Sequence, residues 1–89
     1  MQKVLTFELN KKKYVSKPFD FEAFRLTNEK HLKGEVVGVA SVTIDSVHYM
    51  FEGTEATDDV LMALPVPKLV EMCGKVWIWY NEVLKVKNA

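Results

Sequence analysis

Hydrophobic and polar residues alternate at the start of the chain, in the segment 4–9. Such a period of two is typical of a half-buried strand, and one side of this strand would carry Leu5, Phe7 and Leu9. The segment 10–12, Asn-Lys-Lys, predicts a turn because Asn tolerates left-handed backbone geometry. The segment 13–16 then returns as a second strand. An isolated hairpin is weak in water, so we expect helices to cover it.

The hydrophobic period changes after the hairpin. Asp20 is a good helix N-cap, and Phe19 and Phe24 have the spacing of a hydrophobic staple. We predict a helix over 21–33, with Gly34 as its C-cap.

The segment 35–51 carries conflicting signals. Its many β-branched residues favour a strand, whereas its spacing follows the i, i+3, i+4, i+7 pattern of a helix. The residues that follow the helical pattern are Val36, Val39, Ala40, Thr43, Ile44, Val47, Met50 and Phe51. Strict alternation fails at 36–37, and the segment is longer than an ordinary strand. We predict a helix, and a strand is the alternative.

Two more helices are predicted after a loop at 52–55. Thr57 would cap a short helix that ends before Pro65. The last helix is predicted over 67–87, with Pro67 at its first position. The whole chain, 1–89, is therefore expected to be one α+β domain, an N-terminal antiparallel β-hairpin followed by three to four α-helices.

The last helix has an unusually wide apolar face. At about 100° per residue, the centre of this face carries Leu69, Met72, Cys73, Val76, Tyr80 and Val83. Trp77 and Leu84 extend it on one side and Trp79 and Val86 on the other, so that the apolar arc spans roughly 200°, about twice the minimum for a surface helix. A helix this apolar must be covered from more than one side, and part of the cover could come from another molecule.

Aromatic side chains are favoured anchors of interfaces. The residues that we predict to bind a partner are Trp77, Ile78, Trp79 and Val86. The alternative is that both tryptophans are buried in the core of this domain.

Composition and charge narrow the function classes. The chain has 12 basic and 12 acidic residues, and this neutrality argues against a general binder of nucleic acid or of membrane surfaces. A single cysteine, Cys73, excludes an internal disulfide and suggests a reducing compartment. We find no signal-peptide core and no apolar run of membrane-spanning length, so we expect a cytoplasmic protein. A chain of 89 residues has marginal stability, which fits a protein that self-associates or works in complexes.

Candidate chemistry is sparse. In a helix, Asp45, His48 and Glu52 would share one face and could bind a divalent metal or exchange protons. A solvated polar face is the favoured interpretation, because a metal site also needs supporting partners. Cys73 could be paired with His31 or His48 as nucleophile and base, but its apolar neighbours favour a buried, unreactive thiol.

Lys11, Lys12 and Lys13 form the only basic cluster. Beside Tyr14 they could contact a phosphate backbone, although a solvated hairpin tip is favoured. We therefore predict no catalytic residue, no cofactor and no metal ligand, and we expect a protein that is not an enzyme.

The first third of the chain has the sequence LTFELNKKKYVSKPFDFEAFRLTNEKH, at 5–31. Its strand–turn–strand, which leads directly into a Phe-Asp-Phe helix start, resembles the opening of the tail assembly chaperones of long-tailed phages and prophages of Gram-positive bacteria. The resemblance implies a non-enzymatic assembly factor in the host cytoplasm. It also implies binding to the tape measure protein and the tail tube protein during tail morphogenesis. The alternatives are a generic adaptor or regulatory subunit of a bacterial or prophage complex and, less favoured, a small nucleic-acid-binding protein led by 11–13.

Overall fold

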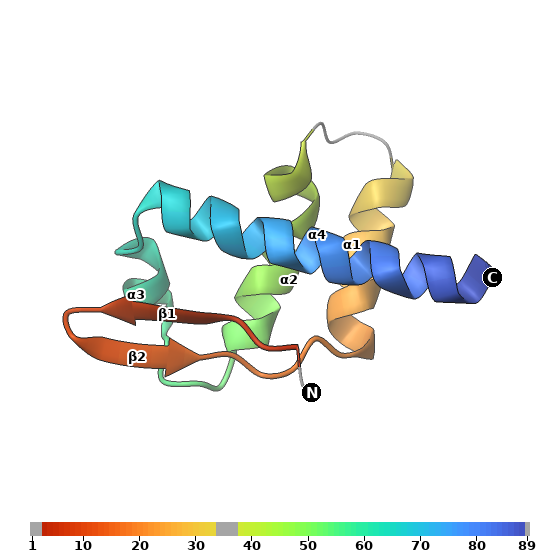
Figure 1. Ribbon diagram of the computed structural model, residues 1–89. Helices are drawn as coiled ribbons and strands as arrows, with labels where there is room; N and C mark the ends of the chain where they lie inside the picture. Colours follow the sequence, from red (N-terminus) through yellow and green to blue (C-terminus); the bar gives the residue numbers. More distant parts are fainter. Residues whose placement is uncertain (1–2, 34–37, 89) are drawn as a thin grey trace.

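A two-stranded hairpin precedes four helices in the computed structural model (Figure 1). The structure describes residues 3–33 and 38–88, with side chains up to Lys85 in the last helix. The elements are β1 (Thr6–Leu9), β2 (Lys12–Val15), α1 (Phe21–Lys33), α2 (Val39–Phe51), α3 (Asp58–Met62) and α4 (Val66–Asn88). The predicted α+β class is confirmed.

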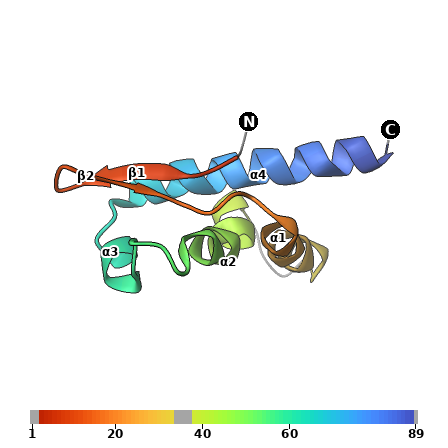
Figure 2. The same ribbon diagram turned by 90° about the horizontal axis from the view of Figure 1, so that it is seen from below.

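The elements form two layers, within overall dimensions of 42 × 30 × 20 Å. Figure 2 shows α4 and the hairpin in one layer and α1, α2 and α3 in the other. Helix α2 packs against both α1 and α4. The C-terminal part of α4 extends beyond α1 (Figure 1).

The hairpin has the predicted strands and a two-residue turn. Asn10 and Lys11 take positive φ values of 53° and 68°, which suits the tight turns that join antiparallel strands. Lys12, predicted in the turn, is instead the first residue of β2 and pairs with Leu9. Leu5 and Phe7 are buried as the alternation predicted, because the hairpin lies over the core with this side inward.

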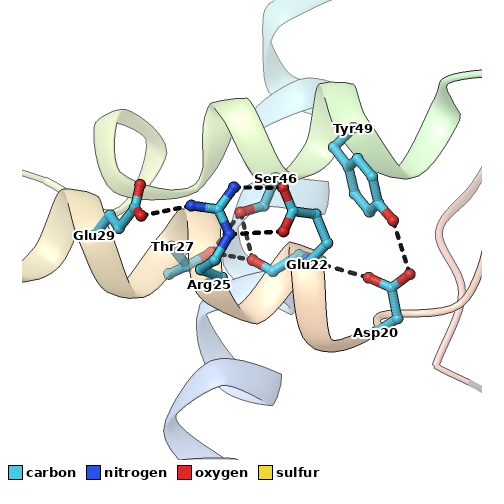
Figure 3. Close-up of polar contacts among 8 residues, drawn as sticks. Asp20, Glu22, Arg25, Thr27, Glu29, Ser46 and Tyr49 are labelled. Carbon is cyan, nitrogen blue, oxygen red and sulfur yellow. Dashed lines mark hydrogen bonds and ion pairs between the residues drawn. The ribbon is translucent and has the colours of Figure 1, made fainter.

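Helix α1 covers 21–33 as predicted, and Asp20 caps it. The Ala23 N–H donates to Asp20 Oδ1 at 3.0 Å, and the Tyr49 hydroxyl of α2 donates to Oδ2 at 2.8 Å (Figure 3). Desolvation is the largest single effect and raises the pKa of Asp20, but these two hydrogen bonds, the backbone N–H of Asp20 and the charge of Lys17 together lower it. Phe19 and Phe24, the predicted staple, both pack against α4, on Trp79 and Tyr80 respectively. The predicted C-cap Gly34 lies outside the described residues.

The lowered pKa of Asp20 predicts acid-sensitive stability. Its contribution is complete above the ordinary value of 3.8 and is lost as the pH falls from there through the lowered value. Asp20→Asn keeps a capping side chain but cannot titrate, so we expect its free energy of unfolding to fall less than that of the wild type between about pH 5 and pH 3. Urea unfolding at both pH values measures this difference.

Asp59→Asn, which makes the same substitution at an exposed residue of α3, is the control and should keep the acid response of the wild type. An Asp20→Asn protein with the same loss between the two pH values would contradict the prediction.

Segment 35–51 is helical from Val39 to Phe51 (α2), as predicted, whereas Gly38, with a φ of 105°, precedes the helix as its N-cap. Residues 35–37 lie outside the described residues. The contact with α1 includes small residues that are completely buried, Ala23 and Thr27 of α1 and Ser46 of α2. Ser46 Oγ donates to the Ala23 carbonyl at 2.9 Å and lies 2.6 Å from Thr27 Oγ1 (Figure 3). This packing outweighs the strand preference of the β-branched residues, because burial of an apolar helix face exceeds intrinsic propensity.

Helix α4 buries the centre of its predicted apolar face. Met72, Cys73, Val76 and Tyr80 are almost fully buried and Leu69 is partly buried. Val83, predicted at the same centre, is instead 38% exposed, because the C-terminal part of α4 extends beyond α1 (Figure 1). The helix begins at Val66, one residue earlier than predicted, and the Pro65 carbonyl accepts the Leu69 N–H at 3.2 Å. Pro67 therefore occupies the second helical position, where a backbone N–H would have no intrahelical acceptor and its loss costs no hydrogen bond.

Candidate interaction groove

An apolar groove of about 440 Å³ lies between α2, α3 and the start of α4. Its apolar lining is Ile44, Val47, Leu61, Met62, Leu64, Val66 and Leu69. Met62 is 86% exposed and Val66 is 68% exposed. Exposed apolar side chains around a hollow are typical of a binding surface.

Pro65 explains why the groove is open. Pro65 disfavours helical backbone at Leu64, so α3, which ends at Met62, does not continue into α4, which starts at Val66. The two apolar side chains therefore flank a sharp turn, where neighbouring elements do not cover them. The sequence predicts a start of the last helix at Pro67 and does not include Val66 among the partner-binding residues; its position beside Pro65, with Met62 before it, is the signal for this groove.

One end of the groove is acidic. His48 Nε2 lies 2.8 Å from Asp58 Oδ1, and His48 Nδ1 lies 3.8 Å from Glu52 Oε1. Asp59 is exposed next to this cluster. His48, Asp58 and Leu61 also line a second hollow, of about 450 Å³, beside the loop 52–57. The carboxylates of Glu52 and Asp58, with Asp59 next to Asp58 in the sequence, make this end attractive to a cationic partner.

The predicted set Asp45, His48 and Glu52 is only partly brought together. Asp45 Oδ2 forms an ion pair with Lys30 Nζ of α1 at 3.2 Å, whereas His48 pairs with Asp58. Sequence spacing missed Asp58 because it lies on another helix. Within residues 3–33 and 38–88, no three His, Cys, Asp or Glu side chains are grouped to hold a metal ion.

Cys73 is a buried thiol, as predicted. Burial raises its pKa although a hydrogen bond with Thr43 acts in the opposite sense, and a raised pKa makes a thiol a poor nucleophile. His31 Nδ1 lies 2.9 Å from the Tyr80 hydroxyl, which donates to Asn28 Oδ1 at 2.9 Å. The structure thus gives His31 a partner on α4 that the sequence did not indicate.

The predicted partner-binding residues do not form one continuous patch. Trp77 packs between His31 and Tyr80, at ring distances of 5.3 and 5.5 Å, whereas Trp79 packs on Phe19. Both indoles are half-buried, and Ile78 between them is 59% exposed. Consecutive helical residues point about 100° apart, which explains the separation. The side chain of Val86 lies outside the described residues. A role of these residues in partner binding stays a prediction.

The basic hairpin tip is partly neutralised. Lys12 Nζ forms an ion pair with Glu55 Oε2 at 3.1 Å and lies 5.3 Å from the centre of the Tyr14 ring. Lys11 and Lys13 are exposed. The tip is therefore a weaker cationic surface than three consecutive lysines suggest.

Comparison with known proteins finds no matching family model, no matching curated protein and no matching solved structure. In the described part of the chain, no helix combines the length and the hydropathy that crossing a membrane requires. Interpretation of the function therefore depends on the groove and on the residues at 5–31.

Proposed function

We propose that this protein is a non-enzymatic tail assembly chaperone that acts in the host cytoplasm and holds an apolar helical segment of the tape measure protein in the groove. The observation that carries the proposal is the open apolar groove, with Met62 and Val66 uncovered at its mouth. The resemblance of residues 5–31 to this family supplies the class of protein and the partner. By the same resemblance, the tail tube protein is a second partner.

The groove fits one face of an amphipathic helix. Recognition of this kind places apolar anchors from successive helical turns into a hydrophobic groove, and this groove is lined on three sides by helices α2, α3 and α4. Covering Met62 and Val66 would remove apolar surface from water, which is favourable in proportion to the area.

The acidic end of the groove adds a second requirement for the occupant. The carboxylates of Glu52 and Asp58 both face the single imidazole of His48, and Asp59, next to Asp58 in the sequence, is exposed. Opposite charges across an interface favour association and determine the orientation of the bound segment. We therefore expect the bound segment to carry Lys or Arg beside its apolar stripe.

The test is capture of the co-expressed tape measure protein by the tagged chain. Met62→Glu should weaken capture at least about tenfold, because it puts a charge into an apolar contact. Leu32→Glu, at a 75% exposed position of α1 outside the groove lining, is the matched control and should leave capture unchanged. Circular dichroism checks that both variants fold.

Equal capture by wild type, Met62→Glu and Leu32→Glu would show that the groove is not the binding site. No capture by the wild type of either the tape measure protein or the tail tube protein would refute the chaperone function and leave a generic adaptor as the alternative.

A further inference from the structure

Gly74 lies in the middle of α4, where the fold does not require a glycine. Glycine is one of the least favourable residues in a helix interior. In the described part of the chain, a Cβ added at Gly74 would meet no atom within 4 Å. The position has room for a side chain, so a different reason for the glycine must be sought, such as the close approach of another backbone.

The neighbours of Gly74 form an exposed apolar row. Val70, one turn before it, is 51% exposed, and Ile78, one turn after it, is 59% exposed. Gly74 lies about 200° around the helix from Val76, which is completely buried. The row therefore faces away from the core, and Figure 2 shows that α1, α2 and α3 all lie on one side of α4. We call Val70, Gly74 and Ile78 the α4 row.

Charged residues flank the α4 row on one side. Glu71 and Lys75 are both exposed and lie about 60° and 100° from Gly74 in the same direction around the helix. Glu71 Oε2 also lies 3.3 Å from Lys68 Nζ of the same chain, in an exposed ion pair that contributes little to stability. A rotation of 180° about an axis through Gly74 exchanges Val70 with Ile78 and places Glu71 near Lys75. Both the apolar and the charged residues are thus complementary to a second copy of the same surface.

We propose that two copies of the chain associate through α4, with the helices antiparallel and crossing at Gly74. The rows at i±4 form the ridges that interdigitate in the commonest helix packing. Glycine at the crossing allows the axes to approach to about 8 Å, the lower end of the usual range. Val70 then packs beside Ile78 of the other copy, and Glu71 pairs with Lys75 of the other copy. A self-complementary patch of this kind gives a closed dimer.

This interface does not depend on the proposed function, because the α4 row shares no residue with the groove lining. A second copy is the favoured occupant because the two-fold rotation brings Val70 opposite Ile78 and, on one side of the row, a carboxylate at Glu71 close to an ammonium group at Lys75. A different protein would not need this symmetry.

Sedimentation equilibrium across the micromolar to millimolar range tests the dimer. We expect a reversible dimer for the wild type and a dissociation constant at least about tenfold higher for Gly74→Gln, since its side chain blocks the crossing. Because Gln is a better helix former than Gly, the variant should keep its helical circular dichroism. A wild type that stays monomeric throughout would overturn the proposal, as would a Gly74→Gln protein that dimerises like the wild type.

Charge exchange provides a second test that does not depend on Gly74. Glu71→Lys and Lys75→Glu should each raise the dissociation constant severalfold, because like charges then face each other. The double variant Glu71→Lys/Lys75→Glu should restore the affinity of the wild type. Failure of the double variant to recover, with the single variants weakened, would show that the two residues do not pair across a two-fold axis and would overturn the geometry proposed.

Discussion

Phe51→Ala is expected to lower the free energy of unfolding by about 3–5 kcal/mol. Phe51 is the last residue of α2 and is 1% exposed. Its ring contacts the ring of Phe7 edge-on at a centroid distance of 5.4 Å. Removing it would leave a cavity where the hairpin, α2 and the loop after α2 meet. The free energy of unfolding of a small domain is about 5–15 kcal/mol. This one change should therefore remove a large share of the total stability. Urea unfolding followed by tryptophan fluorescence measures the effect.

Phe21→Ala is the matched control for Phe51→Ala. It makes the same chemical change on α1, but Phe21 is 78% exposed. We expect an effect within about 0.5 kcal/mol. Similar losses from both substitutions would contradict the burial that the structure assigns to the end of α2.

Tyr80→Ala should also cost about 3–5 kcal/mol, because Tyr80 is 1% exposed and large aromatic truncations in a core are in this range. Its ring contacts three others, those of Phe24 at 5.1 Å, Trp77 at 5.5 Å and His31 at 5.6 Å. These contacts hold the end of α1 to α4. Burial also raises the pKa of the Tyr80 phenol, which keeps it a neutral hydrogen-bond donor.

Tyr80→Phe separates the contribution of the ring from that of the hydroxyl. The hydroxyl joins His31 and Asn28, and an ordinary intramolecular hydrogen bond contributes about 1 kcal/mol net. We therefore expect Tyr80→Phe to cost about 1 kcal/mol, far less than Tyr80→Ala. Equal losses for the two variants, measured by urea unfolding, would mean that the polar network and not the ring packing stabilises this contact.

The two proposed surfaces have different consequences for assembly. The groove would hold one helical segment per chain, whereas the α4 row would bring two chains together. If both are correct, one dimer offers two grooves for apolar segments of a long partner, and linked sites of this kind increase the overall affinity through effective concentration. Met62→Glu and Gly74→Gln should then weaken capture by different routes, and only the second should change the oligomeric state.

Several elements could be predicted because their signals are local. The hairpin follows from the alternation at 4–9 and from a turn residue, Asn10, that tolerates a positive φ. Helix α1 follows from the cap at Asp20, which needs only the next three residues to form its hydrogen bond. The helical spacing of 39–51 also proved a better guide than its β-branched composition, because the spacing determines which face can be buried.

The sequence by itself therefore determined the order and type of the elements and the buried face of α4. Only the tertiary structure decided the contacts between residues that are distant along the chain, such as Tyr49 with Asp20, and the groove that opens at Met62 and Val66. It also decided that Trp77 and Trp79 pack in different directions, against α1 and against Phe19. The physical reason is that periodicity describes which side of one helix is apolar, whereas the angle and offset between helices determine which part of that side remains uncovered.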